Sequence, residues 1–596
     1  MNGSGQGKVY EFKGFRLDGA QRRFLHDGRP VQLKAKIFDL LLFLVERRGQ
    51  LVDKDELMRE VWPNTIVEEN NITVSMSILR KTLGEGVDGR QFIETVPRRG
   101  YRFVADVREI SLGANEATAI SGQVERGQSS LREAPIDSLA VLPIHNVSKD
   151  MSGEYLSKGI TESIINSLSQ VPSLRVMACS TGFRFKGKEV DPQEVGMLLN
   201  VRALMLVRVI QLGKKLIIRS ELVKVSDGSQ IWGEQYERTS SDLLAIQDEI
   251  AKAIVESLKF KLTLQQQKRL TKRYTDNIEA YNLYLRGRYF WTRYSKEWVL
   301  KSIEAFKQAI EIDSSYALAY SGMADAYFRL SNIHLPPSEV MPKAREAALK
   351  AVEIDDELAE AHSSLGLVRV YYDHDWVAAE REFKRCLELN PDLVLGHQRY
   401  GSYLAFIGRF DESNAHYQRA LELDPFSLQI NMNLATNLYL MGEYERAINL
   451  LEKTLDLEPD YIPTHYVLGC TYIQQGDFDK AVAEFQFIYK LDEEAYMALG
   501  FMGYTYALAG QRAEAENLLN ILKDLSLRKH VSPYSMVVIQ LGLGLKDQVL
   551  EMLERLYEER SEWLVWLKVS PELKELREEL AFKDLLSRVG FPNSIA

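Results

Sequence analysis

The chain has 596 residues, of which 45% are hydrophobic and 27% charged, with a formal net charge of −10. This length is too great for one hydrophobic core and favours three or more domains. The acidic balance excludes a protein that coats nucleic acid along its whole length, but the charge is unevenly spread. Residues 8–104 carry 18 Lys and Arg against 14 Asp and Glu, a balance of +4, which leaves −14 for the rest. A mildly basic N-terminal region followed by an acidic remainder of the chain fits a single, local nucleic-acid-binding site.

The three cysteines, Cys179, Cys386 and Cys470, are too few and too scattered for a disulfide framework or a thiolate metal site. They favour small buried side chains in a reducing compartment. The start of the chain, MNGSGQGKVYEF, lacks the apolar core of a signal peptide, and no run of 18 apolar residues occurs. We therefore expect a soluble, cytoplasmic protein with no metal and no cofactor.

Residues 8–33 alternate apolar and polar side chains between glycines, which predicts a small antiparallel sheet. The segment KIFDLLLFLVERR, residues 36–48, predicts a strongly apolar helix that stops at Gly49. A second helix should start behind Asp53, whose side chain can cap it, with Glu56 three residues later as in a capping box. This helix should end before the Pro-Asn pair that follows.

The segment from Ile66 to Leu83, IVEENNITVSMSILRKTL, predicts an amphipathic helix. Apolar residues recur in it at three- and four-residue steps and draw one stripe along the helix: Ile72, Met76, Leu79 and Leu83. The other face is small, amide-rich and ends in cations, which suits a helix that enters a major groove. Its residues are Asn70, Asn71, Thr73, Val74, Ser77, Arg80 and Lys81.

Two predicted strands, residues 92–95 and 101–104, flank a turn that contains Arg98 and Arg99. The resulting hairpin places two arginines at its tip. Base edges specify a DNA sequence, whereas phosphate contacts position the protein on the duplex. A helix that reads bases and a basic hairpin that holds the backbone together predict a winged helix-turn-helix.

With these elements in place, residues 8–107 resemble the winged-helix domain of the OmpR/PhoB class of bacterial transcription regulators. The matching stretches are LLLFLVERRGQLVDKDELMREVWP, VEENNITVSMSILRKTLGE and FIETVPRRGYRFV. The resemblance implies that the third helix enters the major groove, that the wing reaches the adjacent minor groove, and that the loop before the third helix touches RNA polymerase. The implied DNA contacts are the polar helix face above together with Arg98, Arg99 and Tyr101. The implied polymerase loop is Trp62, Pro63, Asn64 and Thr65.

The helix departs from that class at two positions, because many members place two arginines where this chain has Ser77 and Ile78. Base contacts would therefore rest more on the paired asparagines and on Arg80. The alternative for the polar residues is a solvated helix face. The alternative for Trp62 is a core anchor at the end of its helix.

Residues 108–136 are rich in Gly, Ser, Ala and charge and poor in aromatic side chains, which predicts a flexible linker. Response regulators of the OmpR/PhoB class carry a phosphorylatable receiver in front of the DNA-binding domain, whereas only seven residues precede the first predicted strand here. We therefore expect no receiver and no aspartyl-phosphate switch. The signal should enter through the regions that follow.

Residues 137–265 alternate predicted strands and helices, which favours an α/β domain. Segments such as LPIHNVSKDMSGEYLSKGITESIINSLSQVPSLRVMA and LNVRALMLVRV resemble the TolB amino-terminal-like domain. We find no phosphate-binding loop, dinucleotide fingerprint or paired catalytic side chains in this region. We therefore predict no enzyme and leave the role of this domain open.

From residue 275 to residue 560 a repeat predicts an all-α tetratricopeptide solenoid. The phrases EIDS, EIDD, LELNPD, LELDPF, LDLEPD and KLDEEA mark equivalent positions, and the last three intervals are 34 residues each. A small residue follows each mark: Ala324, Gly366, Gly401, Ala435, Gly469 and Gly503. A large residue comes later in most repeats: Phe383, Tyr417, Leu451, Phe485 and Leu519. Residues 561–596 break the period and should cap the array.

The leading hypothesis is a multidomain, sequence-specific transcription regulator that binds double-stranded promoter DNA under the control of a signal or a protein partner. Its plan resembles HilA-like regulators more than the membrane-anchored CadC type. One winged helix makes few phosphate contacts, so we expect a homodimer or tandem half-sites, with the protein partner on the concave face of the repeats. The alternative is a tetratricopeptide scaffold for protein–protein interactions, with DNA binding secondary.

Overall fold

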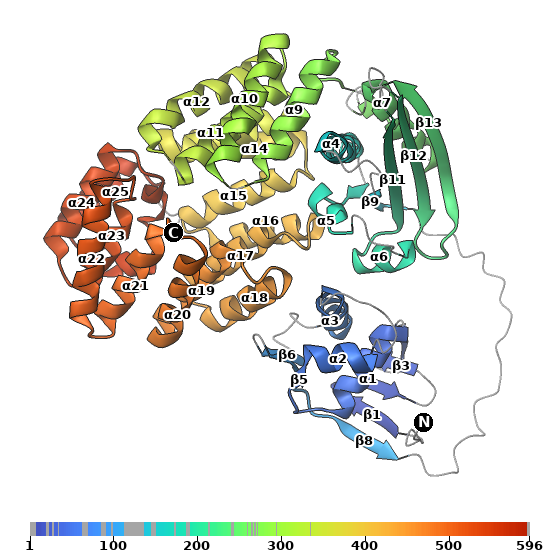
Figure 1. Cartoon of the computed structure of the whole chain (residues 1–596), viewed down its shortest axis with the longest axis horizontal. Coiled ribbons are helices and arrows are strands. Elements are labelled where there is room, and N and C mark those ends of the chain that lie inside the picture. The colour runs from blue at the N-terminus through green and yellow to red at the C-terminus, as the bar shows by residue number, and fades with distance from the viewer. Residues whose placement is uncertain are drawn as a thin grey trace. The chain divides into compact units, whose positions relative to one another are not determined.

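The computed structural model of the chain contains two compact units (Figure 1). The first contains the described residues from 8 to 111, and the second contains residues 136–451 and 460–592. The predicted multidomain class is confirmed: a winged helix, a sheet-containing middle domain and an all-helical array. The structure describes residues 8–19, 23–26, 29–31, 33, 35–61, 70–84, 91–96, 99–111, 136–144, 151–171, 174–185, 191–212, 215–239, 243–258, 260, 262–263, 266–267, 270, 272–293, 295–333 and 335–592.

The first unit follows the predicted order of sheet, helices and hairpin. Its elements are β1 (Lys8–Phe12), β2 (Phe15–Asp18), β3 (Arg23–His26), β4 (Arg29–Pro30), α1 (Ala35–Glu46), β5 (Val52–Asp53), α2 (Lys54–Val61), α3 (Asn70–Leu83), β6 (Ile93–Val96), β7 (Gly100–Phe103) and β8 (Arg108–Ser111). One antiparallel sheet has the strand order β4-β3-β2-β1-β8, and a second has the order β5-β7-β6. The hairpin β6–β7 is the wing.

Strand β8 corrects the predicted start of the linker. Residues 108–111, which the sequence assigned to the linker, pair antiparallel with residues 8–11 of β1. The Arg48 guanidinium also lies 3.5 Å from Glu109 Oε2. The domain therefore extends to Ser111, because its last strand completes a sheet begun by its first.

The local signals for the helices agree with the structure. The Glu56 amide donates a hydrogen bond of 2.7 Å to Asp53 Oδ1 at the start of α2, which is the predicted cap. Gly49, after α1, has a φ of +77°, a conformation that glycine adopts without steric cost. The predicted apolar stripe of α3 lies in the core and is at most 1% exposed: Ile72, Met76, Leu79 and Leu83.

The middle domain is built around one mixed sheet. Its elements are β9 (Ser138–Ile144), α4 (Met151–Leu168), β10 (Arg175–Val176), α5 (Cys179–Phe183), α6 (Pro192–Leu198), β11 (Ala203–Leu212), β12 (Lys215–Lys224), β13 (Gln230–Thr239) and α7 (Leu243–Ser257). The strand order is β10-β9-β11-β12-β13. Strand β9 is parallel to β10 and β11, and β12 is antiparallel to β11 and β13. The alternation of strands and helices predicted this α/β class.

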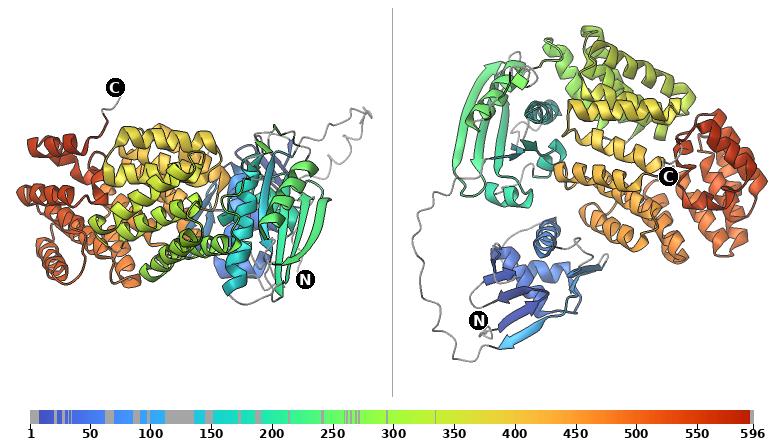
Figure 2. Two further views of the ribbon diagram at one scale, coloured as in Figure 1. Left: turned by 90° about the horizontal axis from the view of Figure 1, so that it is seen from above. Right: turned by 180° about the vertical axis from the view of Figure 1, so that it is seen from behind.

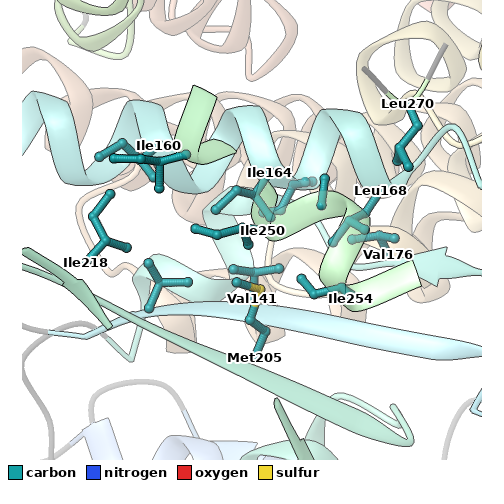
Figure 3. Packing of buried hydrophobic residues seen from close by; sticks show 14 of the residues in the cluster. Val141, Ile160, Ile164, Leu168, Val176, Met205, Ile218, Ile250, Ile254 and Leu270 are labelled. Atoms are coloured by element: carbon teal, nitrogen blue, oxygen red, sulfur yellow. The ribbon is translucent and has the colours of Figure 1, made fainter. Parts of the chain in front are cut away.

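The core of the middle domain lies between the sheet and helices α4 and α7. Figure 3 shows apolar side chains of the two helices facing those of the strands: Ile160, Ile164, Leu168, Ile250, Ile254, Val141 and Met205. These side chains are buried, so the helices cover one face of the sheet.

The array consists of successive helices that pack as pairs. They are α9 (Ile278–Trp291), α10 (Lys296–Ile312), α11 (Ala317–Ile333), α12 (Pro337–Ile354), α13 (Ala359–Val368), η2 (Arg369–Asp373), α14 (Trp376–Leu389), α15 (Val394–Phe406), α16 (Phe410–Leu423), α17 (Leu428–Leu440), α18 (Tyr444–Leu457), α19 (Ile462–Gln475), α20 (Phe478–Leu491), α21 (Tyr496–Leu508), α22 (Arg512–Ser526), α23 (Tyr534–Gly542) and α24 (Lys546–Glu558). The segment η2 is a π-helical turn that continues α13.

The turn that joins the two helices of a pair recurs with the predicted period of 34 residues. A left-handed glycine, with φ between +74° and +85°, recurs every 34 residues: Gly408, Gly442, Gly476, Gly510 and Gly544. The same position one repeat earlier is His374, with a φ of +53°. These turns confirm the tetratricopeptide spacing at the level of the backbone.

The predicted small and large residues face one another in three of the described pairs, whereas Gly503 faces Ile539 rather than Leu519. A Cβ added to Gly366 would lie 2.7 Å from the Phe383 ring, and one added to Gly469 would lie 2.6 Å from the Phe485 ring. Gly401 faces Tyr417 in the same way. The small residue therefore lets the two helices approach around one aromatic ring.

The chain ends in a segment that packs against α23 and α24. It contains η3 (Glu562–Trp566), η4 (Pro571–Leu576) and α25 (Leu580–Val589). Eight of its apolar side chains are at most 1% exposed: Leu564, Val565, Leu567, Leu573, Leu576, Phe582, Leu585 and Val589. Among the helices that the structure describes, none combines the length and apolar character that crossing a membrane requires.

Candidate nucleic-acid interface

Helix α3 carries two rows of residues along its length, and the residues of both rows have the same spacing in the sequence. The buried stripe occupies positions 72, 76, 79 and 83, and positions 70, 74, 77 and 81 repeat that spacing two residues earlier. Two residues correspond to about 200° around an α-helix. By helical register, positions 70, 74, 77 and 81 therefore fall opposite the buried stripe, and among them the structure describes the side chain of Ser77.

The structure describes the polar face of α3 only in part. The side chain of Ser77 is half-buried. Five further predicted contacts lie in α3, but their side chains fall outside the described part of the chain: Asn70, Asn71, Thr73, Val74 and Lys81. Their role in reading bases stays a prediction that rests on helical register.

Arg80 lies on the flank of α3 and reaches the wing. Its Nη2 atom donates a hydrogen bond of 3.2 Å to the carbonyl oxygen of Ile93 and a second one to Thr95 Oγ1. Its guanidinium carbon lies 5.9 Å from the centre of the Tyr101 ring. The recognition helix and the wing are thus joined through this side chain. The contact between Arg80 and DNA remains a prediction, whereas the contact between Arg80 and the wing is observed.

The wing is a regular hairpin in which Glu94 lies opposite Arg102. Their side chains form a cross-strand ion pair at 3.0 Å. Arg99 is exposed next to the turn, whereas Arg98 lies outside the described residues. Tyr101, which the resemblance implied as a DNA contact, lies in the hydrophobic core of the unit.

Gly100 lets the wing approach the rest of the domain. Its φ is +149°, and a Cβ added there would lie 2.0 Å from the carbonyl oxygen of Val52. Strand β5 pairs with β7 at this point, with Asp53 opposite Gly100. A side chain at position 100 would therefore separate β7 from β5.

Sequence reasoning missed the residues that hold the wing in place. The pair of Glu94 and Arg102 could have been found from the hairpin register, since cross-strand neighbours of opposite charge attract. Thr95 carried no such signal, because its partner Arg80 belongs to another element. The predicted polymerase loop, residues 62–65, lies outside the described residues.

The cysteines carry no sign of thiolate chemistry. Burial raises the pKa of the Cys386 thiol to about 12 and also raises the pKa of Cys179 and Cys470. A thiol needs a lowered pKa to act as a nucleophile at neutral pH. Within the described ranges, no three His, Cys, Asp or Glu side chains gather closely enough to hold a metal ion.

Three family models match parts of the chain. The model described as "Transcriptional regulatory protein, C terminal" matches residues 28–103, which include α1, α2, α3 and the wing. The models "Anaphase-promoting complex, cyclosome, subunit 3" and "Tetratricopeptide repeat" match residues 408–488 and 466–526 of the array. The chain thus contains a winged-helix domain of the transcription-regulator type and tetratricopeptide repeats.

Curated relatives share parts of this plan. "Putative adenylate cyclase 3" of Rhizobium meliloti is 31% identical over 237 residues, which are 39% of this chain and 40% of that protein. "Transcriptional regulator HilA" of Salmonella typhimurium is 24% identical over 403 residues, 67% of each chain. "Transcriptional activator CadC" of Escherichia coli is 38% identical over 82 residues, 14% of this chain and 16% of that protein. The chain therefore spans less than half of the first relative and about two thirds of the second.

Proposed function

We propose that this chain is a sequence-specific transcription regulator that binds double-stranded promoter DNA through α3 and the wing. One observation carries the proposal: the apolar stripe of α3 is buried, which turns the polar stripe of the helix away from the core beside a hairpin with an exposed Arg99. Helices of this kind read base edges in the major groove, while basic side chains on neighbouring elements bind phosphates. The similarity to transcription regulators supports this assignment.

In this proposal, the part of the chain that follows the DNA-binding domain controls when that domain acts. Tetratricopeptide arrays present extended surfaces to other proteins, so the array binds a protein partner that governs when the DNA-binding domain acts. One winged helix makes few phosphate contacts, and its affinity at physiological salt is modest. A homodimer on paired half-sites raises that affinity. The loop at residues 62–65 contacts RNA polymerase, and the chain acts as a regulator in the cytoplasm rather than as an enzyme.

Selection from a randomised duplex library, followed by titration of the intact protein at several salt concentrations, tests this proposal. A selected sequence should emerge. Replacing both wing arginines (Arg98→Ala with Arg99→Ala) should weaken binding to all sequences and lower the slope of log affinity against log salt by about 1 to 2. Arg16→Ala is the matched control, because Arg16 is an exposed arginine of β2 in the other sheet.

Asn71→Ala should instead relax the preference at one base position, by about 1–3 kcal/mol, and leave the salt slope unchanged. Weak binding with no selected sequence and no salt dependence would contradict the proposal. That result would favour the scaffold alternative, in which the repeats bind proteins and the winged helix does not regulate promoters.

A further inference from the structure

The C-terminal segment reaches back to helices in the middle of the array. The Trp376 Nε1 atom, at the start of α14, donates a hydrogen bond of 2.9 Å to the carbonyl oxygen of Val589. The ring of Phe591 stacks on the Trp376 indole at 4.6 Å. Arg560 Nη1 donates to the carbonyl oxygen of Tyr372 at 2.9 Å. Figures 1 and 2 show the last helices of the chain beside α14 and α15.

Two further contacts lie on the first helices of repeats. The Trp566 indole meets the Phe406 ring of α15 edge to face, with 4.7 Å between ring centres. The Tyr439 hydroxyl of α17 donates a hydrogen bond to Glu572 Oε1. Both Phe406 and Tyr439 are buried. We call these contacts, together with those of Trp376, the closure contact.

Tetratricopeptide solenoids bind partners on the concave surface that their curvature creates, and each repeat has a first helix followed by a second. In this chain α15 and α17 are first helices, and the segment that covers Phe406 and Tyr439 belongs to the chain itself. Repeats normally touch only their neighbours. The closure contact instead joins the C-terminal segment to helices of repeats that are not its neighbours in the chain.

The segment has a second interface of a different kind. Trp563 stacks on Tyr534 of α23 with the rings 4.7 Å apart and nearly parallel. Fully buried apolar side chains, such as Leu573 and Phe582, form the body of the segment, and η3, η4 and α25 pack against α23 and α24. This apolar interface attaches the segment to the last repeat. The closure contact combines aromatic rings with one carboxyl group.

The chemistry of the closure contact resembles that of a bound peptide. Trp566 supplies an aromatic side chain to Phe406, and Glu572 supplies a carboxyl group to the hydroxyl of Tyr439. Burial raises the pKa of Glu572, and a buried carboxyl group depends on its hydrogen-bond donors for stability. A partner that brings the same two groups can replace both interactions at once.

We propose that the face of α15 and α17 that carries Phe406 and Tyr439 is a protein-binding surface which the chain's own C-terminal segment occupies. A partner protein binds there by presenting an aromatic side chain and a carboxylate in place of Trp566 and Glu572. The segment stays attached to α23 and α24 while the closure contact opens. This inference rests on the proposed role of the array in binding a protein partner, and not on DNA binding.

A labelled peptide of residues 562–576, EWLVWLKVSPELKEL, is the probe, and its binding to the intact protein is followed by fluorescence anisotropy. The variant that combines Trp566→Ala with Glu572→Gln weakens the occupant, so it should bind the peptide at least tenfold more tightly than the wild type. Adding Phe406→Ala and Tyr439→Phe, on the surface itself, should abolish this gain. Leu580→Ala, at a position in α25 that is 84% exposed, is the control and should resemble the wild type.

Hydrogen exchange in the milder variant Tyr439→Phe tests the same idea without the peptide. Exchange should accelerate in residues 562–576 while α24 keeps its protection. Equal acceleration in α24, or no peptide binding by a variant that retains its helical circular dichroism, would overturn the proposal. DNA binding is measured separately, so loss of that activity would count against the proposed function and leave this test intact.

Discussion

Arg80 carries the positive charge that a phosphate contact needs. From its position on α3, however, its side chain reaches the wing. Arg80 follows the buried Leu79, and one residue corresponds to about 100° around a helix. Its guanidinium therefore reaches sideways to the carbonyl oxygen of Ile93 and the hydroxyl of Thr95. Hydrogen bonds from charged groups contribute about 1.5–3 kcal/mol each. Arg80 can thus fix the distance between the recognition helix and the wing.

We predict that Arg80→Ala loosens the wing and weakens binding to all DNA sequences. Amide exchange in residues 93–96 should accelerate by at least tenfold, because β6 loses its tie to α3. The salt slope of DNA binding should stay unchanged, and Arg80→Lys should recover little, since an ammonium lacks the planar fork of a guanidinium. A salt slope lower by about 1, with normal exchange in the wing, would show that Arg80 binds phosphate instead.

At the scale of elements, three described helix pairs of the array have a predicted glycine that faces one aromatic ring. Gly469 of α19 has room for the Phe485 ring of α20 because it lacks a Cβ. Phe485 is fully buried, so neither residue can move without disturbing the pair. The last predicted pair departs from this rule, since Gly503 faces Ile539 of α23 rather than Leu519. In this case Gly503 allows the close approach of α23, which belongs to the next repeat.

We predict that Gly469→Ala destabilises the protein, because the new methyl group would lie 2.6 Å from Phe485 Cζ. Overpacking of this kind costs about 1–3 kcal/mol. Phe485→Leu should destabilise the wild type by removing the ring but should restore part of the loss in the Gly469→Ala background. Urea unfolding of the single and double variants measures this coupling. Strictly additive effects would show that the two positions do not share the space.

At the scale of the second unit, the middle domain and the array share one cluster of buried apolar side chains and are also joined by polar contacts. Arg288 of α9 forms an ion pair of 2.8 Å with Glu162 of α4. Burial opposes ionisation of Glu162, but the charges of Arg288 and Lys158 and the hydrogen bond from Arg288 together outweigh it and lower the pKa of that carboxyl. Near the end of α16, Asp424 accepts a hydrogen bond from Thr181 of α5 at 2.5 Å. These contacts and the shared apolar cluster fit the grouping of the middle domain and the array in one compact unit.

The closure of the array should depend on pH through Glu562, which lies in η3 against η2. Burial raises its pKa from 4.5 to about 7, and the group that faces it is the neutral hydroxyl of Tyr371, whose pKa is raised. A folded-state pKa above the unfolded value means that the closed state is favoured at low pH and loses stability as pH rises through about 7. Protection of residues 562–566, corrected for intrinsic exchange, should therefore fall as the pH rises from 4.5 to about 7 and change little above that.

Glu562→Gln is the control for this prediction, because an amide carries no charge at any of these values. Its protection should not change across the range beyond that seen in α24. Wild-type protection that is independent of pH would show that Glu562 does not ionise in the closed array, and the link between pH and closure would be lost.

The candidate site was predictable where its signal lay within one element. The spacing of Ile72, Met76, Leu79 and Leu83 predicted the buried stripe of α3, since an apolar stripe at helical spacing turns toward the core. The cap at Asp53 and the wing were equally local. The role of Arg80 was not predictable in this way, because it depends on where the wing lies beside the helix.

The sequence by itself determined the classes of the domains and the 34-residue period of the array, because periodicity and turn residues act between near neighbours in the chain. Tertiary structure alone decided that β8 closes the first sheet, that Arg80 holds the wing, and that the C-terminal segment covers α15 and α17. Each of these joins residues that belong to separate elements. Such contacts follow from how whole elements pack, and no local pattern of side chains encodes them.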